Sequence, residues 1–465
     1  MKTRIRSIAE EIIIFISIIK WFILASIIGI IVGLSTTLFL KLLNLSTLAL
    51  HKHSHYYLLL PVALFLSIVL VKYLAPDAEG HGTEKVIEAV HKRSGKIRAA
   101  VVPVKLVATI ITLATGGSVG KEGPCAQIGA GLSSIFSDIF KFDDNDRKKL
   151  VICGISAGFA SVFGTPIAGA IFGIEVLFVG SMMYSVLLPS FIAGIVAYQV
   201  SSALGMTYSY HPINFMPVFS ESFFIKVVLA GVFFGICSVL LIESLKLGEK
   251  YAKRINISKP CKGFIGGLIL IVLTLIFSKD YLGLGIDTIQ KALHGGEIIW
   301  YAFLMKIIFT SVTLSFGGSG GIVTPIFFIG ATAGTLFAQV LGLNPGTFAA
   351  IGFVSLLSGA ANTPIAASIM AVEIFGPTVA PYATVACVVS FLMTGHRSVY
   401  ESQVLAMKKS SSIDVEMGEE MDDIHPEFHQ RKNSVTGLAL YFSKIIKNKI
   451  NGKNGDDQSG GKDEE

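Results

Sequence analysis

Charged residues are scarce in this chain, because Asp, Glu, Lys and Arg together make up 15% of its 465 residues. An average water-soluble domain carries about 25% of these residues. Hydrophobic residues make up 52% of the chain, and the mean hydropathy is +0.67. These values exclude an ordinary soluble protein and indicate one that crosses a membrane many times. We expect one transmembrane domain over residues 1–403 and a short polar cytoplasmic tail over residues 404–465.

The sequence also lacks a cysteine framework and a recognisable metal motif. Five cysteines are scattered in mostly apolar segments: Cys125, Cys153, Cys237, Cys261 and Cys387. Their odd number and spacing fit neither a disulfide scaffold nor a zinc site, so we interpret them as small core residues. A short histidine cluster, His51, His53 and His55, is interpreted as an exposed loop between two spans and not as a metal site. We therefore expect no cofactor and no metal.

One acidic residue stands where a carboxylate is costly. Glu122 lies within Gly120-Lys121-Glu122-Gly123-Pro124, between two long apolar segments. An ionisable residue at membrane depth marks a functional site by default. An ion pair with Lys121 is the structural alternative, but adjacent residues at a helix start rarely face each other. Glu122 is therefore our first candidate for a functional residue.

The chain contains an internal repeat that matches best where glycine and proline interrupt the apolar runs. Residues 116–124 align with residues 317–325 at an offset of 201, and residues 165–175 align with residues 363–373 at an offset of 198. Two matches in the same order at nearly the same offset make a chance repeat improbable. We expect two repeat halves, over about residues 10–204 and 222–403.

Paired interruptions of this kind predict a binding site in a transporter-like chain. Glycine lets the backbone leave a helix, and proline suits the first turn of the next helix. Each interruption then offers a helix start with unpaired N–H groups and a partial positive charge. Two such starts near the membrane midplane make an anion site without any full positive charge, which allows the anion to leave again. The alternative is that these glycines only permit close helix packing.

Basic residues indicate how the chain is oriented. They lie near the N-terminus, in the loop at residues 91–98 and throughout the tail, which predicts that both termini face the cytoplasm. The net charge of +6 is therefore an orientation signal and not a sign of nucleic-acid binding. Residues 1–21 are interpreted as the first helix and not as a secretory signal. Residues 437–450 fit either a basic amphipathic helix on the membrane surface or part of a disordered tail.

The two glycine-proline segments carry a family resemblance. With Gly120-Lys121-Glu122-Gly123-Pro124, Gly321-Ile322-Val323-Thr324-Pro325 and the late Tyr400, the chain resembles the CLC family of chloride channels and chloride/proton exchangers over roughly residues 12–403. The resemblance implies an all-α, multispanning inverted repeat of tilted and broken helices. It also implies a homodimer with one anion pathway in each subunit, located in the plasma membrane.

Two motifs depart from the family pattern. The family's first anion motif, Gly-Ser-Gly-Ile-Pro, is replaced by Gly80-His81-Gly82-Thr83-Glu84, so His81 stands at the central serine. Its third motif, Gly-x-Phe-x-Pro, appears with Val323 in place of phenylalanine. These departures bear on anion selectivity and on the response to pH. His81 is either a pH-sensitive group at the anion site or a loop histidine without an anion role.

The resemblance assigns roles residue by residue. Glu122 is the gating glutamate, whose carboxylate blocks the pathway until it is protonated or displaced. The anion site is formed by the motif residues His81, Gly120, Gly123, Gly321, Ile322, Val323 and Tyr400. Within it, the backbone amides of Ile322 and Val323 donate to the anion, and the Tyr400 hydroxyl completes the site from inside. The alternative for Tyr400 is an interfacial aromatic anchor.

One position separates a channel from an exchanger. Family exchangers usually carry a second acid directly after the glutamate that matches Glu175, and here that position is Val176. A valine has no proton to give, which favours passive chloride conduction, gated by Glu122 and sensitive to pH and voltage. A chloride/proton antiporter is the alternative. Glu175 has a repeat counterpart in Glu373, which suggests a structural helix-end role for both.

Other function classes fit less well. Residues 115–122 superficially resemble a phosphate-binding loop but lack its first glycine, its final serine or threonine and a preceding soluble strand, so we expect no enzyme. A transporter of organic anions should offer arginine, whereas these motifs offer mostly backbone. Residues 408–465 number only 58, fewer than the paired nucleotide-sensing module of eukaryotic members needs, which fits a prokaryotic member. The expected partners are chloride and other small anions, membrane lipid and a second copy of the chain, with no nucleic acid.

Overall fold

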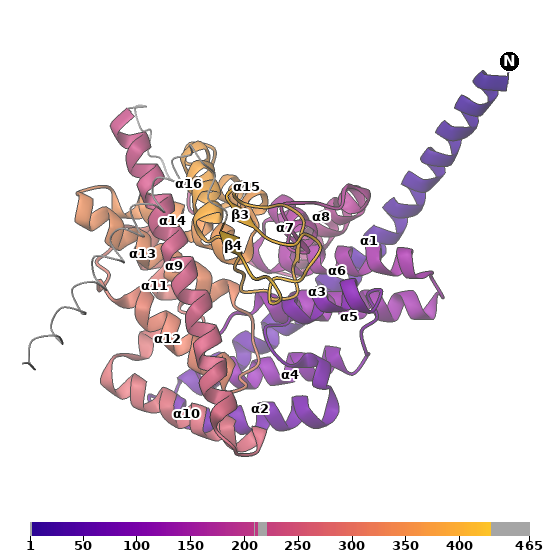
Figure 1. Cartoon of the computed structure of the whole chain (residues 1–465). Coiled ribbons are helices and arrows are strands. Elements are labelled where there is room, and N and C mark those ends of the chain that lie inside the picture. Colours follow the sequence, from indigo (N-terminus) through magenta and orange to yellow (C-terminus); the bar gives the residue numbers. More distant parts are fainter. Residues whose placement is uncertain (1, 209, 213–220, 429–465) are drawn as a thin grey trace, which may run out of the picture.

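The computed structural model describes residues 2–208, 210–212 and 221–428, with side chains from residue 10 onward. These residues form a helical body with two small two-stranded sheets (Figure 1). Six of their helical stretches are long and apolar enough to cross a membrane: Glu10–His51, Tyr56–Leu74, Tyr184–Ala203, Glu221–Arg254, Lys259–Ile276 and Val323–Leu341. The class predicted from composition, a helical multispanning membrane protein, is confirmed.

The described residues of the first half form eight α-helices and three short 3₁₀ turns. The helices are α1 (Lys2–His51), α2 (Leu60–Leu74), α3 (Thr83–Lys92), α4 (Val101–Ala114), α5 (Glu122–Ile139), α6 (Asp144–Phe163), α7 (Pro166–Glu175) and α8 (Leu187–Ala203). The 3₁₀ turns are η1 (Tyr56–Leu59), η2 (Pro76–Ala78) and η3 (Tyr184–Val186). Residues 2–21 begin α1, as expected for a first helix, and this end projects away from the body (Figure 1).

The part of the second half that the structure describes, up to residue 428, also forms eight α-helices. They are α9 (Glu221–Arg254), α10 (Lys259–Ile276), α11 (Ile286–Leu293), α12 (Ala302–Ser315), α13 (Val323–Leu341), α14 (Pro345–Ala361), α15 (Pro364–Phe375) and α16 (Ala380–Met393), with the 3₁₀ turn η4 (Lys279–Tyr281). The local sequence favours helix starts at several places. For example, α14 and α15 each begin with proline, which lacks the N–H that would go unpaired there. The Asn344 side chain also caps α14 by accepting from the Thr347 amide at 2.9 Å.

Many of the apolar helices are too short to cross a membrane alone. Six of them have 10–17 residues, whereas a span of about 30 Å needs about 20 residues. The chain is broken between α4 and α5 at residues 115–121 and between α12 and α13 at residues 316–322. Both breaks fall on the aligned glycine segments. The predicted tilted or broken helices are therefore present at the predicted places.

Hydrogen bonds between the two halves show that the repeat is also a structural two-fold. The Thr109 and Ser319 hydroxyls lie 3.1 Å apart, and so do the hydroxyls of their repeat counterparts, Thr310 and Ser118. Each pair therefore joins one half to the other through equivalent positions. All four side chains are buried, and polar groups need such partners inside a membrane. The halves are thus bonded across a pseudo-two-fold axis close to the two breaks.

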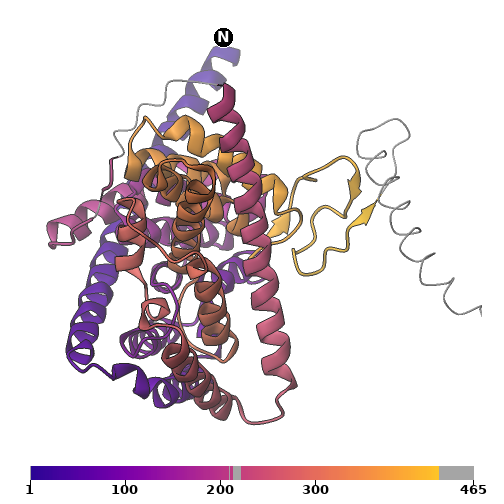
Figure 2. The same cartoon turned by 90° about the vertical axis from the view of Figure 1, so that its left-hand side faces the viewer.

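Residues after Tyr400 are packed as far as the structure describes them. Strand β2 (Val404–Leu405) pairs in parallel with β1 (Phe178–Val179), and β3 (Ile413–Asp414) pairs antiparallel with β4 (Glu427–Phe428). Val415 and Met421 share a small apolar cluster with Phe391 of α16. Figure 2 shows β3 and β4 to one side of the helical body. The segment at residues 404–428 is thus anchored to the membrane domain, while residues 437–450 lie outside the described part.

Candidate anion site

Glu122 and Thr324 bring the two broken segments together. Glu122 is the first residue of α5 and is 1% exposed, while Thr324 is the second residue of α13. The Thr324 amide donates to Glu122 Oε2 at 3.1 Å, and the Thr324 hydroxyl donates to Oε1 at 2.5 Å. The partial positive charge of a helix start favours a carboxylate there. The carboxylate thus occupies donors that a small anion needs.

Two backbone segments approach closely around this carboxylate. Gly120 and Gly321 donate their amides to each other's carbonyl at 2.6 Å. A Cβ atom added at Gly120 would lie 2.4 Å from Glu122 Oε2, and one at Gly321 would lie 2.6 Å from the Gly123 amide nitrogen. Real side chains do not tolerate such distances. At Gly321 the clash is with backbone, which cannot move away, whereas at Gly120 the end of the Glu122 side chain would have to shift.

The loop at residues 80–82 lies against the start of α5. A Cβ atom added at Gly123 would lie 2.1 Å from the His81 carbonyl oxygen, and one at Gly82 would lie 2.5 Å from the Gly123 carbonyl oxygen. Gly82 also has a φ of +82°, in the left-handed region that favours glycine. The His81 Nδ1 atom is shielded from solvent and has no hydrogen-bond partner among the described residues. The loop thus brings His81 to the same place as Gly120, Gly123 and Gly321.

Tyr400 is a deeply buried candidate for this site. It is 0% exposed, which argues against an interfacial anchor, and its hydroxyl has no hydrogen-bond partner in the described part of the chain. The Thr83 side chain and the charges of Glu122 and Glu84 act on that hydroxyl. Its backbone is held by the Ser398 hydroxyl, which accepts from the Tyr400 amide at 2.9 Å. A buried, unpaired O–H is available to a ligand.

The predicted amide donors lie directly beside the observed one. Ile322 and Val323 are fully buried and immediately precede Thr324 at the start of α13. The amide that contacts the carboxylate belongs to Thr324, one residue later than the pair predicted. The sequence analysis includes Thr324 in the motif at residues 321–325 but assigns it no role of its own. The role of the Ile322 and Val323 amides toward an anion stays a prediction.

Val176 and its neighbour Glu175 lie at the end of α7. The Val176 side chain is fully buried, and its carbonyl accepts from the Gln403 side-chain amide at 2.9 Å. Glu175 accepts from the Ile365 and Ala366 amides at 3.0 and 2.8 Å, so its carboxylate caps α15. Glu373 does the same for α7, accepting from two first-turn amides at 3.0 and 2.8 Å. The predicted helix-end role of both glutamates is confirmed.

A buried cation was missed by the sequence reasoning, which expected an anion site without a full positive charge. Lys105 is 0% exposed, and its ammonium donates to the Gly80 carbonyl at 2.7 Å and the Ala78 carbonyl at 3.1 Å. Lys105 therefore lies one residue from His81, whose pKa is lowered first by burial and then by the Lys105 charge. Its repeat counterpart Lys306 donates in the same way to two carbonyls at 2.7 and 3.1 Å. Lys105 and Lys306 are separated by 201 positions, the offset of the repeat, and this spacing could have revealed them as a pair.

Comparison with known proteins decides the family. A family model described as "voltage gated chloride channel" matches residues 63–395, well over half of the chain. The chain belongs to the CLC family. This CLC protein is 38% identical over 400 residues to the chloride/fluoride channel protein of Pseudomonas syringae pv. tomato, covering 84% of this chain and 88% of that relative. It is also 28% identical over 336 residues to the voltage-gated ClC-type chloride channel ClcB of Escherichia coli O9:H4, covering 69% and 79%.

Solved structures support the same conclusion. The fold matches a CLC-type fluoride/proton antiporter with a TM-score of 0.80 and 28% identity, covering 83% of this chain and 98% of that one. It matches a slow cyanobacterial Cl⁻/H⁺ antiporter with a TM-score of 0.70 over 80% and 94% of the two chains, and at 20% identity this likeness shows the fold alone. The predicted CLC-type fold is confirmed. The protein is a multi-pass membrane protein of a family that transports small anions.

Proposed function

We propose that this CLC protein is a halide/proton antiporter that exchanges fluoride or chloride for protons across the plasma membrane. The observation that carries the proposal is the contact of the Glu122 carboxylate with the Thr324 amide and hydroxyl. An anion can use these donors only after the carboxylate has been displaced, and protonation removes the charge that holds it there. Anion binding and proton binding at one glutamate are therefore linked.

The comparisons favour an antiporter over the channel that Val176 suggested. The solved structure matched at 28% identity and a TM-score of 0.80 is a fluoride/proton antiporter. The missing acid at Val176 removes one route for a proton and leaves other routes open. A passive anion channel is the second candidate, and the observation that favours it is the apolar side chain of Val176.

Fluoride is the anion to test first. It occurs in the names of both the P. syringae relative and the antiporter structure. A small, strongly hydrated anion needs strong hydrogen-bond donors to replace its water, and Thr324 offers an amide and a hydroxyl at one point. Chloride is the reference anion, because the matching family model and the E. coli relative are both described as chloride channels.

Further properties belong to the same proposal. Exchange of an anion for a proton moves net charge across the membrane, so the transport rate should depend on voltage. We also propose a homodimer with one site in each subunit, both termini in the cytoplasm and no enzymatic activity. Support for this orientation comes from the basic residues at both ends of the chain.

The test uses purified protein in liposomes with an outward fluoride gradient and no proton gradient. An antiporter drives protons inward, uphill once the interior acidifies, and Glu122→Gln lets fluoride pass without proton movement. Chloride in place of fluoride measures selectivity in the same assay. Fluoride flux without proton flux in the unmodified protein, and a reversal potential that ignores a pH gradient, would establish the channel and overturn the antiporter.

A further inference from the structure

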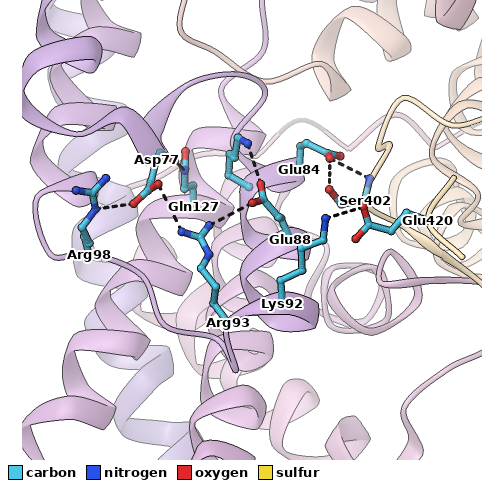
Figure 3. A network of polar contacts seen from close by, with 10 residues as sticks. Asp77, Glu84, Glu88, Lys92, Arg93, Arg98, Gln127, Ser402 and Glu420 are labelled. Atoms are coloured by element: carbon cyan, nitrogen blue, oxygen red, sulfur yellow. Dashed lines mark hydrogen bonds and ion pairs between the residues drawn. The ribbon is translucent and has the colours of Figure 1, made fainter. Parts of the chain in front are cut away.

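Glu84 is a second carboxylate close to the anion site. It is the second residue of α3 and stands where the family's first motif has proline. Its Oε1 atom accepts from the Ser402 amide at 2.9 Å and from the Ser402 hydroxyl (Figure 3). Its Oε2 atom is shielded from solvent and has no hydrogen-bond partner within the described ranges. The side chain as a whole keeps partial exposure, so it is not sealed off from water.

Glu84 and Glu122 are linked through the segment that carries Tyr400. Ser402, which holds Glu84, follows Tyr400 by two residues. The Tyr400 hydroxyl makes no direct hydrogen bond among the residues described, and the Thr83 side chain and both carboxylates act on it. An O–H group of this kind can accept one hydrogen bond while donating another. The two acids therefore lie near one polar group that can help to order a path between them.

An antiporter needs a proton carrier on the cytoplasmic side of its gate, and Val176 cannot be one. We propose that Glu84 takes protons from the cytoplasm and delivers them to Glu122, an inference that rests on the antiport function proposed above. Partial exposure gives Glu84 access to water, and its free Oε2 atom is a site for the proton. The position where family exchangers usually carry the proton donor thus holds Val176, and Glu84, a residue of another motif, takes that role.

The ionisation of Glu84 suits this task. Burial raises the pKa of Glu84 to about 7, against the opposing effect of the hydrogen bonds from Ser402. The negative charge of Glu401 raises this pKa further, and the neighbouring Lys85 lowers it. Helix α3 is not one of the apolar spans. A proton carrier works best when its pKa lies near the operating pH, because both forms are then populated.

The proton step needs no other reactant. A protonated Glu84 loses its proton and becomes a carboxylate, and the Glu122 carboxylate gains that proton and becomes a neutral acid. The neutral Glu122 releases the Thr324 donors to an incoming anion. Glu84 then takes a new proton from cytoplasmic water through its partly exposed side. One proton thus crosses from the cytoplasmic side to the gate in each cycle.

A purely structural role is the competing explanation, in which Glu84 only ties α3 to the segment after Tyr400. Glu84→Gln separates the two roles. The glutamine Oε1 atom can still accept both hydrogen bonds from Ser402, but the amide cannot carry a proton at neutral pH. Glu88→Gln is the matched control, because Glu88 lies one turn after Glu84 on α3 (Figure 3) and pairs with Lys85 at 2.8 Å.

The experiment measures fluoride and proton fluxes in the same liposomes. We expect Glu84→Gln to keep fluoride flux within about threefold and to lower proton flux at least about tenfold, because a positioned acid contributes at least that factor. Glu88→Gln should match the unmodified protein. If Glu84→Gln keeps the proton-to-fluoride flux ratio of the unmodified protein, the role of Glu84 is overturned and the antiport function is not. Absence of proton flux in the unmodified protein overturns the antiport function and the role of Glu84 with it.

Ser402→Ala supplies an independent readout that keeps the carboxylate. Its hydroxyl donates to Glu84, and a hydrogen bond to a carboxylate lowers that group's pKa. Removing the hydroxyl should therefore raise the pKa of Glu84 and shift the cytoplasmic pH of half-maximal proton flux upward by about half a unit to one unit. This variant decides the question if Glu84→Gln fails to fold. An unchanged pH profile with intact fluxes would then overturn the role of Glu84.

Discussion

Gly120 and Gly321 exchange two backbone hydrogen bonds of 2.6 Å, although they are 201 positions apart in the sequence. The pairing forms an isolated antiparallel bridge between the break before α5 and the break before α13. It places Glu122, two residues after Gly120, against Thr324, three residues after Gly321. The candidate anion site therefore lies where two equivalent positions of the repeat meet.

This pairing makes Gly120 sensitive to the smallest substitution. We expect Gly120→Ala to displace the Glu122 carboxylate, because the added Cβ would lie 2.4 Å from Oε2 and 3.0 Å from the Thr324 amide nitrogen. Proton-coupled fluoride flux in liposomes should fall by about tenfold or more. Gly205→Ala is the control, since it has a φ of +84° but open space around its Cβ. Equal effects of both substitutions on flux would contradict a specific clash at the site.

The Thr324 hydroxyl should hold the gate closed. Thr324→Val keeps the shape of the side chain but removes a hydrogen bond to a charged group, which is worth about 1.5–3 kcal/mol. The gate should then close less completely, so that fluoride passes without a proton and the proton-to-fluoride ratio falls. The ratio of the two fluxes measures this effect. Thr324→Ser restores the hydroxyl and should restore the ratio, and failure to do so would point to packing instead.

The buried lysines allow a matched comparison within one chain. Lys105 and Lys306 each bind two loop carbonyls, so Lys105→Met and Lys306→Met should each lower stability by about 1–3 kcal/mol. Only Lys105 bonds to the loop that contains His81, so only Lys105→Met should weaken fluoride binding. Thermal unfolding and the fluoride concentration of half-maximal flux measure the two effects. An equal loss of affinity in Lys306→Met would contradict a local effect of the Lys105 charge.

The two capping glutamates should matter for stability and not for proton coupling. Glu175→Gln and Glu373→Gln each leave one oxygen to accept two first-turn amides, and each loses a charge beside a helix start. We expect each variant to lose about 1 kcal/mol of stability, seen as a lower thermal midpoint. The proton-to-fluoride ratio should stay unchanged. A lost ratio in Glu175→Gln at normal stability would show that Glu175 carries protons.

Much of the fold and part of the site could be predicted from the sequence. The glycine-proline interruptions predicted the breaks before α5 and α13, because backbone chemistry at such residues is local. The repeat predicted that the breaks are equivalent, and the costly acid predicted that Glu122 is functional. The comparisons favour the antiporter over the channel predicted from Val176. The absence of an acid at Val176 shows only which residue does not carry the proton.

The sequence by itself determined the membrane class, the repeat and the broken helices, and it predicted a functional role for Glu122. Each of these follows from composition or from the conformational preferences of neighbouring residues. Only the tertiary structure decided that Thr324 donates to Glu122, that Lys105 lies beside the His81 loop, and that Glu84 binds Ser402. These contacts join residues that are 25 to 318 positions apart. Their geometry depends on how the two halves pack, which no local pattern encodes.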